Sequence, residues 1–321
     1  MFRTVEVIIP TYKPDMRLRL LLRGLKTQSY PVSRVHIINT EQEYWQEDIL
    51  PDMGNIQVKV THISTEQFDH GATRHRGAVE ALADFLLFMT QDAVPADDEL
   101  VTRLVKVMEG HIANATEQIA VAYARQLPVT REVFEKYYND CDNTVGRVSS
   151  KEVVVDEIEI YTRSFNYPPE SWVKTKADIE NMGIKAFFSS DVCAMYDKAS
   201  YEKIGGFVSP TVFNEDMIFA ADAIRKNYAV AYVADAKVYH SHNYSLKALY
   251  RRNFDMGISQ MQYADRFEGI SSEKEGVRLV TTTAKHLAKS GRIYLIPKLV
   301  LTSAAKYLGY RAGKKCWTKN K

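Results

Sequence analysis

The alternation of short apolar runs with amphipathic helical segments is the feature that most restricts how this chain can fold. The first run, Val5–Pro10, is dense in β-branched residues, which is typical of a strand buried on both faces. The leucines of Leu18–Leu25 predict a helix, and Val35–Asn39 and Val58–Ile63 predict two more strands. Strands that alternate with helices imply βαβ units. We therefore expect an α/β fold, with a mainly parallel sheet flanked by helices.

The alternation continues along the chain. Gly71–Phe85 has helical spacing, with Ala78, Leu82 and Phe85 on one face, and it leads into an expected strand at Phe85–Met89. Further helices are expected at Leu100–Met108, Tyr201–Gly206 and Asp216–Asn227, and further strands at Ile119–Arg125, Phe187–Tyr196, Ala229–Val233 and Lys237–Tyr239. Because ligands collect beyond the carboxyl ends of parallel strands, functional residues are expected just after strands.

Two stretches depart from this pattern. From Gln126 to about Lys185 the periodicity weakens, which indicates an insertion with partly helical segments. From Leu246 onward everything has helical spacing. We therefore divide the chain into an α/β domain over residues 1–245 and a C-terminal helical region over residues 246–321.

Composition restricts the class of protein. Hydrophobic residues make up 45% and charged residues 26%, the balance of a soluble globular protein. No stretch approaches the roughly 20 apolar residues that span a bilayer, and the N-terminal apolar run is too short for a signal peptide. The three cysteines are scattered and form no metal-binding spacing, which suits a reducing cytoplasm.

The net charge of +2 hides an asymmetry. Eleven of the 42 Lys and Arg, and none of the 40 Asp and Glu, follow residue 275, so the first 275 residues carry 31 basic and 40 acidic side chains. Within this basic tail, Arg292–Tyr310 mixes leucines, aromatics and lysines, which suggests an interfacial amphipathic helix attracted to anionic lipids. A helix packed on the body or on a partner subunit is the alternative. The acidic body lacks an aromatic and basic recognition stretch, so nucleic-acid binding is not expected.

Six short motifs follow one another in a fixed order: IIPTY, TRHRGA, FMTQDA, GGF, FNED and a histidine after a strand. In this order they resemble the family 2 glycosyltransferases of the GT-A fold, over roughly residues 4–245. Within that family, the stretches FDHGATRHRGA, TQDAVP and HSHNYS look most like bacterial rhamnosyltransferases that use dTDP-L-rhamnose. The resemblance implies a GT-A-type, Rossmann-like sheet with a C-terminal helical extension, and inverting transfer from a nucleotide sugar.

Asp92 follows the apolar run FLLFMT, at an expected strand end. There a carboxylate could hold a divalent cation, Mg²⁺ or Mn²⁺, against the diphosphate of the donor. Relatives usually carry two or three aspartates here, whereas this chain has Thr90 and Ala93 at the neighbouring positions. This difference favours weak, donor-assisted metal binding. The alternative is a helix-capping or turn aspartate.

Asp216 matches the second acid of the family's ED pair, and the resemblance implies that it is the catalytic base. Inverting transfer needs a base to take the proton of the attacking acceptor hydroxyl. Glu215 beside it could orient the acceptor or the structure. The alternative is that both acids only stabilise the N-terminus of a helix.

His240 and His242 are alternate residues of an extended segment, so both imidazoles can face one site. By resemblance one of them, with His240 preferred, is a metal or diphosphate ligand. His242 is kept as a secondary candidate, and a purely structural histidine is the alternative reading of each.

The remaining candidates divide by the part of the substrate that they would contact. For the donor nucleotide and diphosphate these are Pro10, Thr11, Tyr12, Asn39, Thr40, Glu41, Arg74, Arg251 and Arg252, together with Asp92. For the acceptor they are Ser189, Ser190 and Asp191. Arginine suits phosphate because its guanidinium matches two oxygens at once, although a solvated Arg74 is the alternative.

The leading hypothesis is an inverting transferase that moves L-rhamnose from dTDP-β-L-rhamnose onto a lipid-linked saccharide, in the synthesis of a cell-surface polysaccharide. It would work in the cytoplasm, peripheral at the inner face of the cell membrane, as a monomer or a homo-oligomer. One alternative is a glycosyltransferase with another donor, such as a UDP-hexose. The other is a non-catalytic nucleotide-binding or membrane-scaffold protein.

Overall fold

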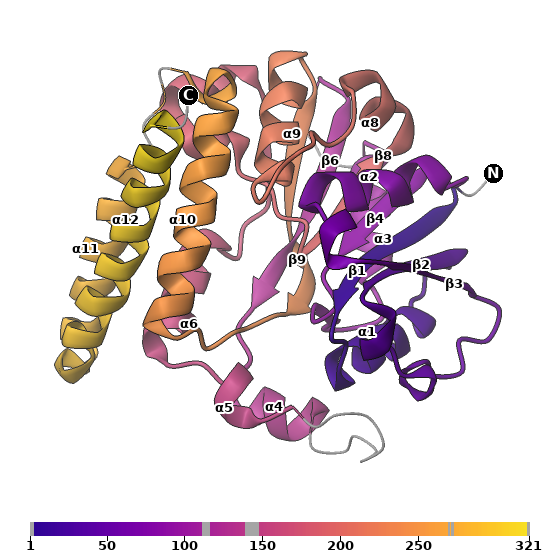
Figure 1. Cartoon of the computed structure of the whole chain (residues 1–321), viewed down its shortest axis with the longest axis horizontal. Helices are drawn as coiled ribbons and strands as arrows, with labels where there is room; N and C mark the ends of the chain where they lie inside the picture. Colours follow the sequence, from indigo (N-terminus) through magenta and orange to yellow (C-terminus); the bar gives the residue numbers. More distant parts are fainter. Residues whose placement is uncertain (1–2, 111–115, 139–147, 269, 271–272, 320–321) are drawn as a thin grey trace.

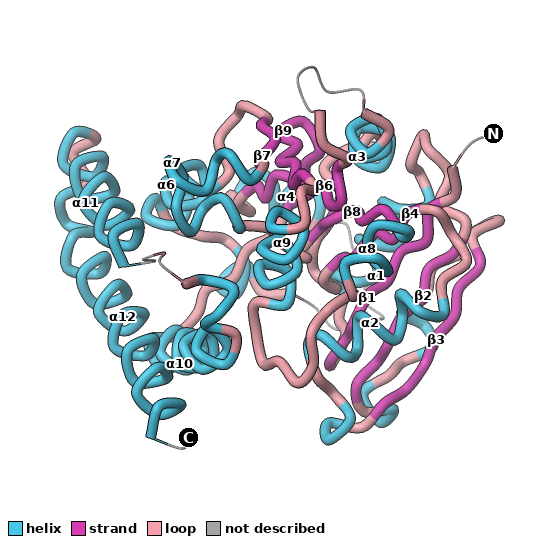
Figure 2. The backbone as a smooth tube through the Cα atoms, turned by 90° about the horizontal axis from the view of Figure 1, so that it is seen from above, coloured by secondary structure: helices cyan, strands magenta, loops and turns pink. Residues whose placement is uncertain are grey.

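One mixed sheet with helices on both faces forms the body of the molecule, and three helices follow it at one side (Figures 1 and 2). The structure is a computed structural model that describes residues 3–110, 116–138, 148–268, 270 and 273–319. The strands are β1 (Val5–Tyr12), β2 (Arg34–Thr40), β3 (Gln57–Ile63), β4 (Phe85–Met89), β5 (Val94–Pro95), β6 (Ile119–Leu127), β7 (Trp172–Lys174), β8 (Cys193–Asp197) and β9 (Ala229–Tyr239).

The order of the strands confirms the expected α/β fold. Across the described part of the chain it runs β3-β2-β1-β4-β8-β6-β9-β5, and β7 also pairs with β9. Strands β3, β2, β1 and β4 are parallel to one another, and β6 is parallel to β9. Strand β8 lies antiparallel between β4 and β6, so it joins the two parallel parts into one sheet.

Helices cover both faces of the sheet. The bounds are α1 (Met16–Lys26), α2 (His70–Glu80), α3 (Leu100–Met108), α4 (Arg131–Tyr137), α5 (Ser150–Val153), α6 (Glu157–Asn166), α7 (Ile179–Met182), α8 (Lys198–Ile204), α9 (Glu215–Arg225), α10 (Leu246–Gln262), α11 (Glu273–Lys289) and α12 (Ile296–Lys319). Alternate residues of β1 point to opposite faces: Val7 and Ile9 pack in the cluster that contains the α1 and α3 leucines, and Ile8 packs in the cluster of α8 and α9. Burial on both faces explains why Val7, Ile8 and Ile9 are three consecutive apolar residues in β1.

The predicted helix over Gly71–Phe85 is wrong at its C-terminal end. Helix α2 stops at Glu80, Leu82 is 87% exposed, and Phe85 is fully buried as the first residue of β4. The Phe85 N–H donates to the carbonyl oxygen of Thr4. The pairing of β4 with β1 therefore removes Phe85 from the helix that local spacing predicts.

Two strand predictions also need correction. The strand predicted at Phe187–Tyr196 begins only at Cys193, because the preceding polar residues form a loop in which the Asp191 N–H donates to Asp216. The strands predicted at Ala229–Val233 and Lys237–Tyr239 are a single strand, β9. The register between β6 and β9 shifts between Ala124 and Arg125, which pair with Val233 and Lys237 of β9. The break in the apolar pattern of β9 lies between these two partners.

The C-terminal region is helical, as expected, and α12 packs against α10 through glycines. A Cβ atom on Gly309 would lie 2.2 Å from the carbonyl oxygen of Tyr250, and one on Gly313 would lie 2.0 Å from that of Phe254. Only glycine allows two helix backbones to approach so closely. No helix in the described ranges is long and apolar enough to cross a membrane.

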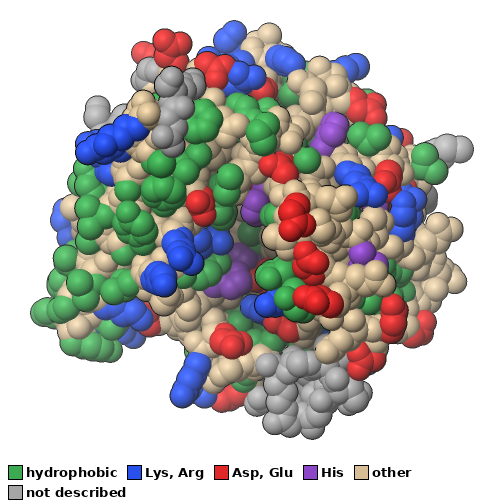
Figure 3. Space-filling model, in the orientation of Figure 1, with side chains coloured by type: hydrophobic (Ala, Val, Ile, Leu, Met, Phe, Trp, Pro, Cys, Tyr) green, Lys and Arg blue, Asp and Glu red, His purple; other side chains and the backbone are tan. Residues whose placement is uncertain are grey.

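The opposite face of α12 is apolar and exposed. Val300, Leu301, Tyr307 and Leu308 are each more than half exposed, and they are seven residues apart in two pairs, which places them on one stripe. We call these four residues the α12 stripe. Figure 3 shows hydrophobic side chains gathered on this side of the molecule, over α11 and α12. Helix α12 therefore packs on the body, which is the alternative given for this segment, and the interfacial helix stays a prediction.

We expect Gly313→Ala to destabilise the chain by about 1–3 kcal/mol, because the added methyl group would meet a main-chain oxygen that cannot move independently. The measurement is the urea midpoint followed by circular dichroism. Gly276→Ala in α11 is the matched control, since nothing lies within 4 Å of its added Cβ, and it should leave the midpoint unchanged or raise it. Equal midpoints for wild type and Gly313→Ala would contradict the close packing of α10 and α12.

Candidate active site

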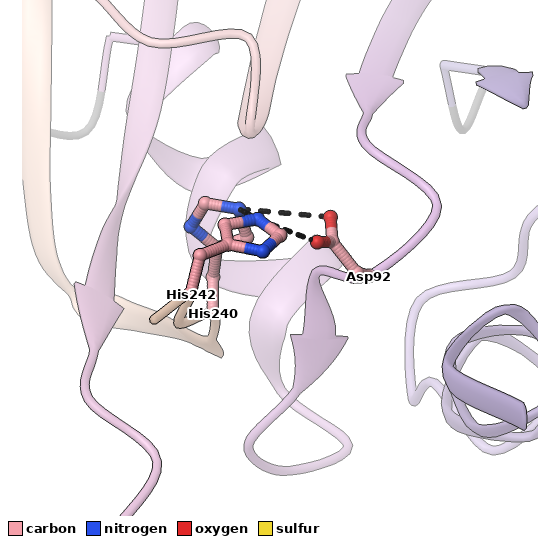
Figure 4. Close-up of side chains that lie close together, drawn as sticks. All are labelled: Asp92, His240 and His242. Carbon is pink, nitrogen blue, oxygen red and sulfur yellow. Dashed lines mark hydrogen bonds and ion pairs between the residues drawn. The ribbon is translucent and has the colours of Figure 1, made fainter. Parts of the chain in front are cut away.

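Asp92, His240 and His242 converge on one point at the carboxyl ends of the strands. Asp92 follows β4, and the two histidines follow β9. The short β5, which begins two residues after Asp92, pairs Val94 with Tyr239 and so brings the two segments together. In Figure 4 the two histidines lie on one side of the site, and both imidazole rings point at the Asp92 carboxylate on the other side.

The atoms of this triad are close enough to share one cation. The His242 Nε2 lies 2.8 Å from Asp92 Oδ2, the His240 Nε2 lies 3.6 Å from Asp92 Oδ1, and the two Nε2 atoms are 3.1 Å apart. One ligand atom from each residue lies within 4.8 Å of the others. The carboxylate suits Mg²⁺ or Mn²⁺, and the two imidazoles suit divalent transition metals. The residues present therefore fit a divalent cation.

The protonation states also suit metal binding. Burial by itself would raise the pKa of Asp92, but His240, His242 and the Arg17 guanidinium outweigh it and hold that pKa well below its usual range. Burial lowers the pKa of His240 to about 3. At neutral pH Asp92 is thus ionised and His240 is neutral, and these are the forms that bind a cation.

Arginines from three different helices surround the triad. The Arg17 Nη1 lies 3.8 Å from Asp92 Oδ2, and the Arg163 Nη1 lies 3.5 Å from the Nδ1 of His240. The Arg252 guanidinium lies over the rings of Phe213 and Tyr244, at 4.9 and 4.7 Å from their centroids. Figure 3 shows basic and histidine side chains beside a hollow near the centre of this face. Such a cationic surround is suited to phosphate oxygens.

Sequence reasoning singled out Arg252 but missed Arg17 and Arg163. Arg17 belongs to the first turn of α1, where its guanidinium is also paired with Asp15. Arg163 belongs to α6, inside the insertion, where it pairs with Glu159. Each looks like an ordinary helical ion pair in the sequence, so local pattern provides no signal for either.

The residues proposed for the nucleotide lie together at the ends of β1 and β2. The Thr11 hydroxyl donates to Asn39 Oδ1 at 3.0 Å, and the Asn39 Nδ2 donates to the carbonyl oxygen of Glu41 at 3.0 Å. Tyr12 follows Pro10 and Thr11 in β1, and this residue is 49% exposed. The side-chain amide of Gln91 exchanges two hydrogen bonds with the main chain of Tyr12, at 2.8 and 3.1 Å. Gln91 therefore ties these strand ends to the Asp92 turn, and it too was missed from the sequence.

Arg74 lies away from the Asp92 triad, in a buried cluster of acids. Its side chain is 6% exposed, its Nη1 lies 3.0 Å from Glu215 Oε1, and its Nε lies 3.5 Å from Asp191 Oδ2. In the described part of the chain Arg74 forms ion pairs with these two acids, whereas the sequence grouped it with the donor candidates. It places the guanidinium as the counter-charge of two acids that flank Asp216.

Asp216 lies at the N-terminus of α9, beside these acids. Its two carboxylate oxygens accept main-chain N–H groups, from Asp191 at 3.2 Å and from Met217 at 2.7 Å. Burial and then the Glu215 carboxylate raise the pKa of Asp216 to about 7, although the two N–H groups and Arg74 oppose them. Burial, followed by the neighbouring Asp216, also raises the pKa of Asp191. A carboxylate with a pKa near 7 is suited to accept a proton at neutral pH.

Ser190 connects this acid side to the triad. Its hydroxyl accepts a hydrogen bond from the Gln126 Nε2 at 2.8 Å, and the Gln126 Oε1 lies 3.0 Å from the Nδ1 of His240. The loop that contains Ser190 and Asp191 therefore contacts both groups of functional candidates. Gln126 was taken from the sequence only as the start of the insertion.

Comparison with known proteins gives a consistent result. The model of "Glycosyl transferase family 2" matches residues 6–205. The chain is 32% identical over 313 residues to the O-antigen chain rhamnosyltransferase RfbN of Salmonella typhimurium, which covers 97% of this chain and 89% of the relative. It is 30% identical over 312 residues to the O-antigen chain rhamnosyltransferase WbaN of Salmonella anatum, at 96% and 88% coverage.

Solved structures support the fold. The mannosyltransferase PcManGT from Pyrobaculum calidifontis, in complex with GDP-Man and Mn²⁺, superposes with a TM-score of 0.55 at 13% identity and covers 100% of this chain and 88% of its own. S. aureus TarS in complex with UDP-GlcNAc gives a TM-score of 0.50 at 13% identity, with 99% and 92% coverage. At this identity the similarity is one of fold.

The acid cluster generates a prediction about proton uptake. Removing the negative charge of Glu215 favours the ionised form of Asp216, so Glu215→Gln should move the protonation midpoint of Asp216 from about 7 to a lower pH, by about one unit. The midpoint is measured by NMR titration of ¹³C-labelled aspartate carboxyls, with the resonance assigned by its loss in Asp216→Asn. Glu202→Gln, which changes an exposed carboxylate in α8, is the control and should leave the midpoint in place. An unchanged midpoint in Glu215→Gln would show that Glu215 does not raise the pKa of Asp216.

Proposed function

The chain belongs to glycosyl transferase family 2, and we propose that it transfers L-rhamnose from dTDP-β-L-rhamnose to a saccharide acceptor with inversion at the anomeric carbon. The observation that carries this proposal is the pairing of two sites: a triad surrounded by arginines, and a carboxylate whose pKa is raised to about 7. The rhamnosyl donor is supported by the two rhamnosyltransferase relatives, each of which matches nearly the whole chain.

The triad side is proposed to bind the donor. The ends of β1 and β2, with Pro10, Thr11, Tyr12, Asn39 and Glu41, would hold the nucleotide. Asp92 and His240 would hold Mg²⁺ or Mn²⁺, which supplies positive charge against the leaving nucleoside diphosphate. Arg17, Arg163 and Arg252 lie around the same point and would contact the phosphate oxygens.

The acid side is proposed to activate the acceptor. Asp216 takes the proton of the attacking hydroxyl while the acceptor oxygen bonds to the anomeric carbon and the bond from that carbon to the diphosphate breaks. Asp191 donates its main-chain N–H to the carboxylate of Asp216 and so orients it. Arg74 and Glu215 set the charge around that carboxylate. Attack from the face opposite the leaving group gives inversion.

The C-terminal region 246–321 is proposed to hold this domain at the inner face of the cell membrane, where a lipid-linked saccharide would be presented. The α12 stripe supports it, because exposed apolar residues on a helix rich in lysine and arginine suit the interface of an anionic bilayer. The close packing of α12 on α10 leaves this stripe facing outward. Both relatives are O-antigen chain enzymes by name, in keeping with a polysaccharide acceptor.

We expect Asp216→Asn to lower the transfer rate by about 10²–10⁴-fold, because the amide cannot accept the hydroxyl proton. The transfer rate to a lipid-linked saccharide is measured with dTDP-rhamnose, UDP-glucose and GDP-mannose as donors. Binding of dTDP to each variant is measured separately by calorimetry. Asp222→Asn, on the same helix but beside Arg266, is the matched control and should keep full activity. If the wild type uses UDP-glucose and not dTDP-rhamnose, the proposed donor is wrong. If Asp216→Asn keeps full activity, Asp216 is not the catalytic base.

We expect the double substitution Leu301→Glu and Leu308→Glu to reduce binding to vesicles that contain phosphatidylglycerol, since it places two negative charges in the α12 stripe. Co-sedimentation at low salt measures the bound fraction. Leu82→Glu makes the same change at an exposed leucine of the α/β domain and should bind as wild type does. If the double variant sediments like wild type, α12 is not the membrane contact.

A further inference from the structure

The side-chain amide of Gln126 uses every hydrogen-bonding position it has. Its Oε1 accepts from the Arg163 guanidinium and lies 3.0 Å from the Nδ1 of His240. Its Nε2 donates to the hydroxyls of Tyr167 and Ser190. An amide offers two acceptor and two donor positions, so this one is fully satisfied. Gln126 is 4% exposed, which makes an unpaired position costly.

Arg163 determines which way the amide points. A guanidinium can only donate hydrogen bonds, so the atom that it contacts is the amide oxygen and not the nitrogen. Glu159 in turn accepts from the Nη2 of Arg163 at 2.8 Å, which holds the guanidinium in place. The orientation of Gln126 therefore follows from an ion pair in α6.

The orientation of Gln126 favours one tautomer of His240. Oε1 can only accept a hydrogen bond, and at 3.0 Å it is closer to the His240 Nδ1 than the Arg163 Nη1 is, at 3.5 Å, so the contact favours a proton on Nδ1. The neutral ring then has its lone pair on Nε2, the atom that faces Asp92 and His242. A histidine ligand is commonly fixed in this way, by a hydrogen bond from its other nitrogen. His240 is therefore preset as a cation ligand.

We propose that Gln126 is a positioning residue of the transfer reaction, which holds His240 ready for the cation and joins it to the loop that orients Asp216. The inference rests on the proposed function for its reaction. Through Ser190 the same amide reaches the segment whose next residue, Asp191, donates its N–H to the base. Gln126 thus links the donor side to the acceptor side within one buried network.

The first test is Mn²⁺ binding to the full chain, measured by electron paramagnetic resonance of the free ion. Gln126→Leu removes the acceptor for the His240 Nδ1–H, so its affinity for Mn²⁺ should fall about 10- to 100-fold. Gln126→Glu keeps an acceptor for both Arg163 and His240, and its affinity should be no lower than that of wild type. Gln118→Leu, at an exposed glutamine just before β6, is the matched control and should leave the affinity unchanged.

The second test reads the tautomer without metal, by ¹⁵N NMR of the histidine side chains. Wild type and Gln126→Glu should show His240 protonated at Nδ1, and Gln126→Leu should show the Nε2-protonated form. Equal Mn²⁺ affinity and an unchanged tautomer in Gln126→Leu overturn the inference. Wild type that binds no Mn²⁺ but transfers rhamnose overturns it too, and leaves the proposed reaction intact. A chain with the expected affinities and no transfer from any nucleotide sugar refutes the proposed reaction instead.

Discussion

The pairing of β9 with β5 and β6 is the constraint on which the candidate active site depends. Tyr239, the last residue of β9, lies opposite Val94 on one side and Leu127 on the other. The His240 N–H then donates to the carbonyl oxygen of Leu127 at 3.0 Å. These main-chain contacts bring Asp92 and His240 together although 147 residues separate them in the chain. The distance between Asp92 and His240 is therefore set by main-chain pairing in the sheet.

Charge is distributed unequally over the two halves of the site. Around Asp92, arginines and histidines outnumber the acids, and the pKa of the aspartate is held low. Around Asp216, among the residues that the structure describes, Glu215 and Asp191 outnumber the guanidinium of Arg74, and the pKa of Asp216 is raised. The opposite pKa shifts suit the two aspartates to the different roles proposed for them, Asp92 as an anion beside a cation and Asp216 as a proton acceptor. Buried Gln126 lies between these halves without adding charge of its own.

The C-terminal helices contribute to both the site and the surface. Arg252 of α10 lies over the rings of Phe213 and Tyr244, next to the histidines. The glycine face of α12 packs against the same helix, so the α12 stripe faces outward. A cavity of about 230 Å³, lined mainly by apolar residues such as Phe188 and Met217, lies between these helices and the α/β domain. Helix α10 therefore contacts both α12, the proposed membrane helix, and residues beside the proposed donor site.

The sequence by itself determined the α/β class, most strands and helices, the family, and Asp92, Asp216 and His240 as candidates, because apolar periodicity and ordered motifs are local signals. It overextended α2 to Phe85, since burial of that ring in the sheet is a tertiary effect. The partners of the candidates were decided by the tertiary structure alone. Arg17, Gln126 and Arg163 come from three separate elements, and each looks ordinary within its own segment. Their roles arise from distances across the fold, which hydrogen bonds and burial set and which local spacing does not encode.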